Sequence, residues 1–311
     1  MNILLTGAAG QLGSELLPLL AVRGSVIPLD RSAPPQPAPG WVTLDLMDGA
    51  ALETLLNRTR PTLVVNTAAY TAVDQAEDDP ETACEINATL PGRLAGWARR
   101  NGAGLVHYST EYIFDGEADS PYIETDAPNP LNVYGDSKLA GEKAVIAADC
   151  RHVILRASWV YSSHGKNFLL SMLNLARKGL SLKVVDDQRG CPTWARNLAL
   201  ATDAVIGAWL EPGQQDLGGV YHYRDSQAMN WYEFARAIFA RALEAGLLRE
   251  QPDIAPVPSS GFQRPARRPG FSVLDTGKIH RAFGVVPADF QQSLAAVIDE
   301  VRRRELPGNQ N

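Results

Sequence analysis

The sequence has 311 residues, 45% of them hydrophobic and 21% charged, which suffices for one large α/β domain or a domain with a smaller one appended. Its formal net charge is −6 and it has no long basic run, which argues against nucleic acid as a partner. The sequence also argues against a membrane-spanning protein, because no apolar run is long enough to cross a bilayer, and against a disulfide-stabilised one, because three widely spaced cysteines do not form a disulfide framework.

Short β-branched or Leu-rich runs alternate with longer helical patterns over the first half of the chain. They predict strands over residues 2–6, 25–30, 41–46, 62–66, 104–110 and 152–158. Helices are predicted over residues 11–22, 49–58, 81–100 and 134–148, with a Pro-rich loop over 31–40. This alternation is typical of an α/β fold with a parallel, doubly wound sheet.

Three glycines, Gly7, Gly10 and Gly13, join the first predicted strand to its helix. Glycine permits a tight turn, a close approach of the backbone to a pyrophosphate, and close packing of the helix on the strand. The helix N-terminus adds partial positive charge. The spacing is G-x-x-G-x-x-G rather than G-x-G-x-x-G, but its place between strand and helix predicts a dinucleotide site.

Residues after the next three strands extend the expected cofactor site. Asp30 ends the second strand, where an acid holds ribose hydroxyls and favours NADH, while Arg31 could pair with a 2′-phosphate and leaves NADPH open. Asp45 and Leu46 follow the third strand and suit an adenine contact; a capping Asp and a core Leu are an equally open interpretation. Beyond the fourth strand the cofactor edge comprises Ala68, Ala69, Tyr70 and Thr71.

From about residue 160 the pattern changes. A helix over 167–178 and a strand over 182–186 continue the alternation, but Pro, Gly and aromatic residues become more frequent. We expect a Rossmann-type NAD(P)-binding domain over residues 1–160, to which part of 180–225 returns. Residues 161–311 would mainly form a smaller, substrate-binding domain.

Tyr134 and Lys138 lie four positions apart in a predicted helix, so they share a face. Thr110 closes the preceding strand, and strand carboxyl ends face the ligand crevice. The three suit carbonyl reduction: Tyr134 gives a proton to the developing alkoxide, Lys138 lowers the phenol pKa and can bond the nicotinamide ribose, and Thr110 orients the carbonyl oxygen. Glu142 and Lys143, further along, are expected on the solvated face of the helix.

Many motifs in order resemble the extended short-chain dehydrogenase/reductases, and within them the dTDP-4-dehydrorhamnose reductase family. They are MNILLTGAAGQLGSEL, VVNTAAYTAVDQAE, STEYIFDG, NVYGDSKLAGE, ILRASWVY, DDQRGCPT, NWYEFA and RPARRP, and they span nearly the whole chain. The resemblance implies an oxidoreductase that uses NADPH or NADH to reduce the 4-keto group of dTDP-4-dehydro-β-L-rhamnose. The product, dTDP-L-rhamnose, is a precursor of cell-surface polysaccharides such as lipopolysaccharide.

The resemblance also implies individual roles. Tyr134 matches the family's proton donor, Lys138 its helper and Thr110 the substrate-orienting hydroxyl. Glu111 stands where the family usually has Asp and reaches one methylene further, and Trp159 matches a substrate-side aromatic, with a core Trp as the alternative. The cofactor-binding positions are Gly10, Gln11, Leu12, Asp30, Asp45, Leu46, Ala69, Tyr70 and Thr71, and either Arg267 or Arg268 lies near the substrate diphosphate.

Other activities stay open at this stage. A different dTDP-4-keto-6-deoxyhexose could be the substrate, or the chain could be a nucleotide-sugar epimerase or 4,6-dehydratase. Dehydratases carry an Asp-Glu pair after the Thr, whereas Glu111 is followed by Tyr112. A non-catalytic nucleotide-binding subunit is the remaining alternative.

Metal, assembly and location are weaker expectations. Some family members bind magnesium at a dimer interface through clustered carboxylates; Glu15, Asp186 and Asp187 are acidic at comparable places, but we assign no metal. A homodimer is consistent with the resemblance. The cysteine pattern and the lack of a basic leader before the strand at Asn2 favour the cytoplasm, with no membrane partner.

Overall fold

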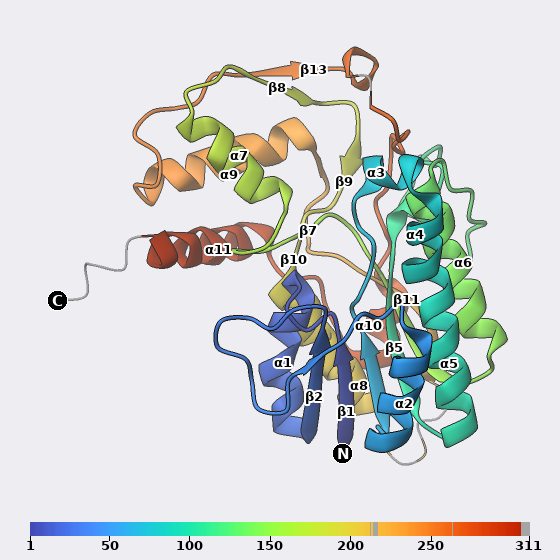
Figure 1. Ribbon diagram of the computed structural model, residues 1–311. Coiled ribbons are helices and arrows are strands. Elements are labelled where there is room, and N and C mark those ends of the chain that lie inside the picture. The colour runs from blue at the N-terminus through green and yellow to red at the C-terminus, as the bar shows by residue number, and fades with distance from the viewer. Residues whose placement is uncertain (212, 214–216, 263, 306–311) are drawn as a thin grey trace.

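A seven-stranded parallel sheet forms the centre of the molecule in the computed structural model, which describes residues 1–211, 213, 217–262 and 264–305 (Figure 1). The strands lie in the order β11-β6-β5-β4-β1-β2-β3. They are β1 (Asn2–Thr6), β2 (Ser25–Asp30), β3 (Val42–Thr43), β4 (Leu63–Asn66), β5 (Gly104–Thr110), β6 (Arg151–Ala157) and β11 (Gly219–Tyr223). The predicted parallel, doubly wound sheet is confirmed, and its order reverses between β1 and β4, the point at which sheets of this kind bind ligands outside the carboxyl ends of the strands.

Helices cover both faces of this sheet. One layer contains α1 (Gln11–Arg23), α8 (Ala195–Trp209) and α10 (Gly277–Phe283), and the other contains α2 (Gly49–Thr59), α5 (Leu90–Asn101) and α6 (Val133–Ala147). Successive strand residues point to opposite faces. In β1, Ile3 and Leu5 join the apolar cluster of the first layer, whereas Leu4 joins that of the second.

Two predicted elements differ from those observed. The helix expected over 81–100 is divided into α4 (Pro80–Cys84), a π-helical turn at Glu85–Thr89, and α5, and a short helix α3 (Val73–Asp78) precedes it. The strand expected over 41–46 is only β3, because the chain turns at Asp45, whose carboxylate accepts a hydrogen bond from Met47 N.

The chain beyond residue 160 builds a third apolar cluster and also returns to the sheet. The helices α7 (Phe168–Arg177), α9 (Trp231–Glu244) and α11 (Phe290–Glu305) share this cluster. The strand β8 (Leu182–Val185) pairs with β13 (Ile254–Val257), away from the central sheet, so it does not continue the doubly wound alternation as expected. Figure 1 shows α7, α9, β8 and β13 on one side, with α11 between them and the central sheet.

The short strands β7 (Val160–Tyr161), β9 (Arg189–Gly190), β10 (Thr193–Trp194) and β12 (Met229–Asn230) connect these regions. Among the residues that the structure describes, no helix combines the length and apolar character needed to cross a membrane.

Candidate active site

The glycine loop between β1 and α1 is too tight for side chains at two positions. Gly7 has φ +67°, and a Cβ there would lie 2.7 Å from Ala68 N; a Cβ at Gly13 would lie 2.1 Å from Gly7 O. Gly10 begins α1 without a side-chain cap, and the first turn has no acidic residue. The first amides of α1 are therefore available to an anion, as a pyrophosphate site requires.

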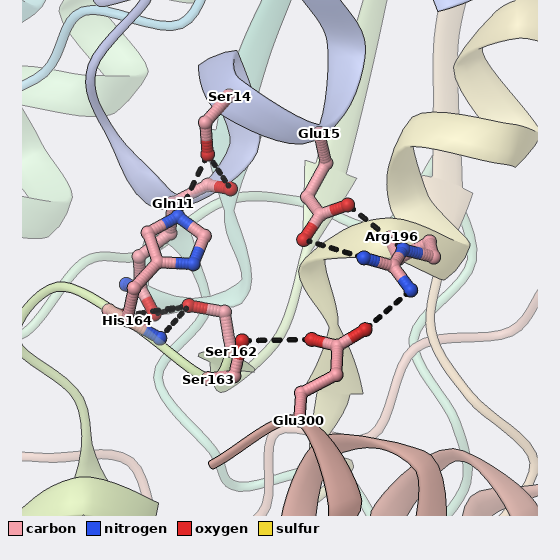
Figure 2. A network of polar contacts seen from close by, with 8 residues as sticks. All are labelled: Gln11, Ser14, Glu15, Ser162, Ser163, His164, Arg196 and Glu300. Atoms are coloured by element: carbon pink, nitrogen blue, oxygen red, sulfur yellow. Dashed lines mark hydrogen bonds and ion pairs between the residues drawn. The ribbon is translucent and has the colours of Figure 1, made fainter. Parts of the chain in front are cut away.

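Gln11 connects this loop to the segment after β7. Its side-chain oxygen accepts a hydrogen bond of 2.9 Å from Ser162 Oγ, and Ser14 Oγ lies 2.7 Å from His164 Nε2 (Figure 2). The same Gln11 oxygen also accepts a hydrogen bond of 2.9 Å from Asn167 Nδ2. Leu12, the next residue of α1, packs against the apolar cluster of the layer that contains α1, α8 and α10. The sequence contains no local signal for the contacts with residues 162–167, because they join segments about 150 residues apart.

The candidate metal carboxylates have other partners. Glu15 forms an ion pair with Arg196 at 2.8 Å, and Arg196 also contacts Glu300 from α11 (Figure 2). The Asp187 carboxylate accepts hydrogen bonds from Ser259 N and Oγ. Asp186 lies directly after β8. No group of three or more His, Cys, Asp or Glu residues suited to a metal occurs within the described ranges.

The carboxylate of Asp30 at the end of β2 lies against the glycine loop. It accepts hydrogen bonds from Ala9 N (3.0 Å) and Arg31 N (2.7 Å), and the Arg31 side chain is exposed. Asp45 is exposed, and Leu46 is buried in the cluster beneath α2, so this Leu has the core position that the second interpretation expected. Asp48, rather than Asp45, caps α2.

The segment after β4, Ala68 to Thr71, is held by a residue that the sequence analysis missed. Asn87, in the π-helical turn, accepts a hydrogen bond from Tyr70 N (2.9 Å) and donates to Tyr70 O (3.0 Å) and Ser137 Oγ (2.9 Å). Ala68, Ala69 and Tyr70 are half-buried, and Thr71 is exposed. Asn87 thus joins the expected cofactor edge to α6.

Thr110, Tyr134 and Lys138 come together where β5 ends and α6 begins. Asn132 caps α6 by accepting from Gly135 N (2.8 Å), which starts the helix one residue before Tyr134. Lys138 is 3% exposed, and its ammonium donates to Tyr108 O at 2.6 Å. Burial lowers the pKa of Lys138 to about 8.

Tyr134 is a neutral donor in this environment. Burial and the nearby charge of Glu111 raise its pKa, and a hydrogen bond with Thr110 opposes them in part. The Lys138 ammonium donates its hydrogen bond to the carbonyl of Tyr108, and the lowering of the Tyr134 pKa by its charge stays a prediction. The ring of Tyr112, another residue missed from the sequence, packs edge-on against Tyr134 at 5.6 Å between centroids.

Glu111 is a buried carboxyl beside the Thr110 hydroxyl. Thr110 Oγ1 donates to Glu111 Oε2 at 2.8 Å and accepts from Tyr112 N at 3.2 Å. Burial raises the pKa of Glu111 to about 7, partly opposed by hydrogen bonds with Thr110 and with Ser158 and the Trp159 backbone. This carboxyl therefore titrates near neutral pH, beside the Thr110 hydroxyl that is expected to orient the substrate.

A cleft of about 1080 Å³ opens beside these groups, lined by Tyr112, Trp231, Arg267 and Arg268 among others. Arg268 donates to both oxygens of Asp74 at 2.9 Å, whereas the exposed Arg267 guanidinium has no hydrogen bond or ion pair with any other described residue. Both arginines therefore line the cleft, but Arg268 is paired with Asp74, whereas the Arg267 guanidinium is not paired with another described residue.

Trp159 lies on the edge of the third apolar cluster, which α7, α9 and α11 share. Its ring stacks on Trp231, which lines the cleft, with 3.5 Å between centroids and an interplanar angle of 8°. The chain is unusual here: Trp159 has φ +44°, and a Cβ at Gly190 would lie 2.4 Å from the indole. Sequence reasoning did not identify Trp231, whose role depends on pairing with a distant segment.

The solvated position expected for Glu142 is wrong, whereas Lys143 is exposed as expected. Glu142 is 1% exposed and forms an ion pair with Arg156 of β6 at 2.7 Å. It follows Lys138 by one helical turn and so lies on the same buried face. The pairing across to β6 explains how this charge is tolerated inside the protein.

Known proteins resemble this chain over almost its whole length. The family model described as the RmlD substrate binding domain matches residues 1–303. The dTDP-4-dehydrorhamnose reductase of Escherichia coli K12 is 40% identical over 301 residues, which cover 97% of this chain and 98% of that protein.

Two solved structures of this kind are also similar. A dTDP-4-dehydrorhamnose reductase from Clostridium acetobutylicum is 36% identical with a TM-score of 0.85, covering 97% of this chain and 100% of that one. The one from Bacillus anthracis, in complex with NADP, is 30% identical with a TM-score of 0.84, over 96% and 99% of the two chains.

Proposed function

Because the chain belongs to the dTDP-4-dehydrorhamnose reductase family, we propose that it uses NADPH or NADH to reduce the 4-keto group of dTDP-4-dehydro-β-L-rhamnose. The product is dTDP-L-rhamnose, a precursor of cell-surface polysaccharide. The observation that carries the proposal is the meeting of Thr110 with Tyr134 beside the buried Lys138, at the same carboxyl-end edge of the sheet as the glycine loop.

The glycine loop fits a nicotinamide dinucleotide, since side chains are excluded at Gly7 and Gly13 and α1 begins uncapped. The backbone amides at the start of α1, from Gln11 to Gly13, would hold its diphosphate, and Asp30 with Arg31 its adenosine ribose. The exposed Asp45 would contact the adenine, and the segment from Ala68 to Thr71 the nicotinamide half. When bound, this cofactor supplies a hydride to the carbonyl carbon.

Tyr134 donates a proton to the carbonyl oxygen as negative charge develops on it. The ammonium of Lys138 is charged below its pKa of about 8 and stabilises the tyrosinate that remains. Thr110 has a single hydroxyl proton, which it donates to Glu111. When Glu111 is protonated it can donate to Thr110 instead, and this frees the Thr110 proton for the substrate oxygen.

The cleft is the proposed site of the sugar nucleotide. Arg267 and Arg268 line it, and guanidinium groups suit diphosphate oxygens. Trp159, through its stack on Trp231, supports the wall of the cleft. Residues 1–160 with part of 180–225 would bind the cofactor, and 161–311 mainly the substrate; the separate apolar cluster around α7, α9 and α11 supports this division. We further propose a cytoplasmic homodimer.

The test is turnover of the purified protein with dTDP-4-dehydro-β-L-rhamnose and each reduced cofactor. Loss of the reduced-nicotinamide absorbance is expected, with the product identified by NMR. Tyr134→Phe should fold normally and lower kcat by roughly 10²–10⁴-fold. Absence of cofactor oxidation, or unchanged turnover in Tyr134→Phe, would refute the proposal.

A panel of other dTDP-4-keto-6-deoxy sugars in the same assay determines which stereochemistry the cleft accepts. An epimerase or dehydratase would convert a sugar without stoichiometric cofactor oxidation, and a binding subunit would bind the cofactor without turnover. Light scattering on the purified protein measures the proposed dimer directly.

A further inference from the structure

A buried ion pair lies behind the catalytic helix. Arg156 of β6 donates to both carboxylate oxygens of Glu142 in α6, from Nε at 2.9 Å and from Nη2 at 2.7 Å. Arg156 is 4% exposed and Glu142 1%. Charges this deep are retained only with close pairing, and two parallel hydrogen bonds also fix the relative orientation of their elements.

Arg156 connects further elements to this pair. Its Nη1 donates to His222 Nε2 of β11 at 3.2 Å, and the Nδ1 of that ring lies 3.0 Å from Tyr122 O. The Nδ1–H tautomer satisfies both contacts, and burial with the Arg156 charge lowers the pKa of His222 to about 3, so the ring stays neutral. The guanidinium also lies over the Phe114 ring, 5.4 Å from its centroid.

The pair touches both elements that carry the proposed catalytic groups. Glu142 is one turn beyond Lys138 on the buried face of α6. Arg156 is the register partner of Ser109 in β5, and the next residue, Ala157, is the partner of Thr110. A change in the pair would therefore move α6 relative to the strand end at Thr110.

We propose that Glu142 is a positioning residue for the reduction: with Arg156 it sets α6 against β5 and β6, and its carboxylate keeps the Lys138 ammonium charged. This inference rests on the proposed function. It assigns a role to a buried residue outside the proposed cofactor and substrate sites.

Several groups face Lys138. From β5 these are the Tyr108 carbonyl, which accepts a hydrogen bond from the ammonium, and His107, whose pKa is lowered by burial and by the Lys138 charge. From α6, the Glu142 carboxylate opposes the effect of burial on the pKa of Lys138. Arg156 and the neutral His222 lie beyond Glu142. Removing the Glu142 charge leaves Lys138 with positive or neutral neighbours, so its proton is lost at lower pH.

The experiment compares Glu142→Gln with Asp225→Asn. Asp225 is a matched control: a 0% exposed carboxylate that accepts from Trp194 N and Asn197 Nδ2, outside the Lys138 environment. The first readout is the pH profile of kcat/KM. Its alkaline limb should move down by about 1 pH unit or more in Glu142→Gln and stay in place in Asp225→Asn.

The second readout needs no turnover. The chain has six lysines, so protein labelled with ¹³C at lysine Cε gives a simple NMR spectrum, and Lys138→Met assigns the Lys138 signal. That signal should titrate at lower pH in Glu142→Gln than in the parent protein. If the parent protein has no reductase activity, the proposed function fails, and this titration still decides the electrostatic part.

Equal pH limbs and equal Lys138 titration in the parent and in folded Glu142→Gln would overturn the inference, as would an equal shift in Asp225→Asn. If Glu142→Gln does not fold, the Glu142→Leu/Arg156→Met double variant replaces it, because apolar groups often substitute for a buried pair without loss of stability. It should show a smaller downward shift of the same limb, and an unchanged limb there would also overturn the inference.

Discussion

Glu111 shows how one buried carboxyl links stability to pH at the site. Its pKa is raised from an ordinary 4.5 to about 7, because burial disfavours the charged form. The folded state then binds this proton more tightly than the unfolded state. The contribution is fully present below about 4.5 and is lost as pH rises to about 7, at most about 3 kcal/mol in total.

We therefore predict that Glu111→Gln is less sensitive to pH than the parent protein. Between pH values of about 4.5 and 7, the free energy of unfolding of the parent should fall more steeply than that of the variant. Urea denaturation across this range measures the difference. The buried Asp225, whose pKa is raised to about 6, contributes equally to both proteins and cancels in the comparison. Parallel curves would contradict the prediction.

At the scale of elements, the contact of α1 with β1 depends on Gly13. A Cβ there would lie 2.1 Å from Gly7 O and 2.8 Å from Ala8 Cα, and backbone atoms cannot move aside cheaply. Gly13→Ala should displace α1, lower the stability by about 1–3 kcal/mol and weaken NADPH binding, measured by thermal unfolding and calorimetry.

The matched control is Gly96→Ala in α5, where the added Cβ would lie 3.5 Å from Arg100 Nη1 and helix propensity favours Ala. Equal behaviour of the two variants would refute this account.

The sequence predicted those elements and groups whose signal is local. The glycine loop, the strands and the Tyr134–Lys138 pair each depend on spacing within one segment or two adjacent ones. Asn87 and Glu142 were missed or misplaced because their partners, Tyr70 and Arg156, come from other elements. A polar residue in a helix gives no sign of such a partner until the tertiary packing is known. The division of the expected 81–100 helix by a π-helical turn was not predicted for the same reason, since Asn87 lies in that turn.

At the scale of the whole molecule, Arg196 joins the helical cover of the central sheet to the last helix. It extends from α8 to Glu15 in α1 and Glu300 in α11, and Ser163 donates to the other oxygen of Glu300 (Figure 2). The side chains of the two carboxylates are only 10% and 12% exposed, and Arg196→Met would remove the guanidinium with which both are paired. Because Arg196 itself is 42% exposed, solvent screens part of the loss, and we expect a fall of about 2 kcal/mol in the free energy of unfolding.

The control variant is Arg99→Met, which removes the exposed pair with Asp149 and should change the free energy of unfolding by less than about 1 kcal/mol. Urea denaturation of both variants tests whether this three-helix junction, rather than surface charge in general, stabilises the molecule; equal effects would show that it does not.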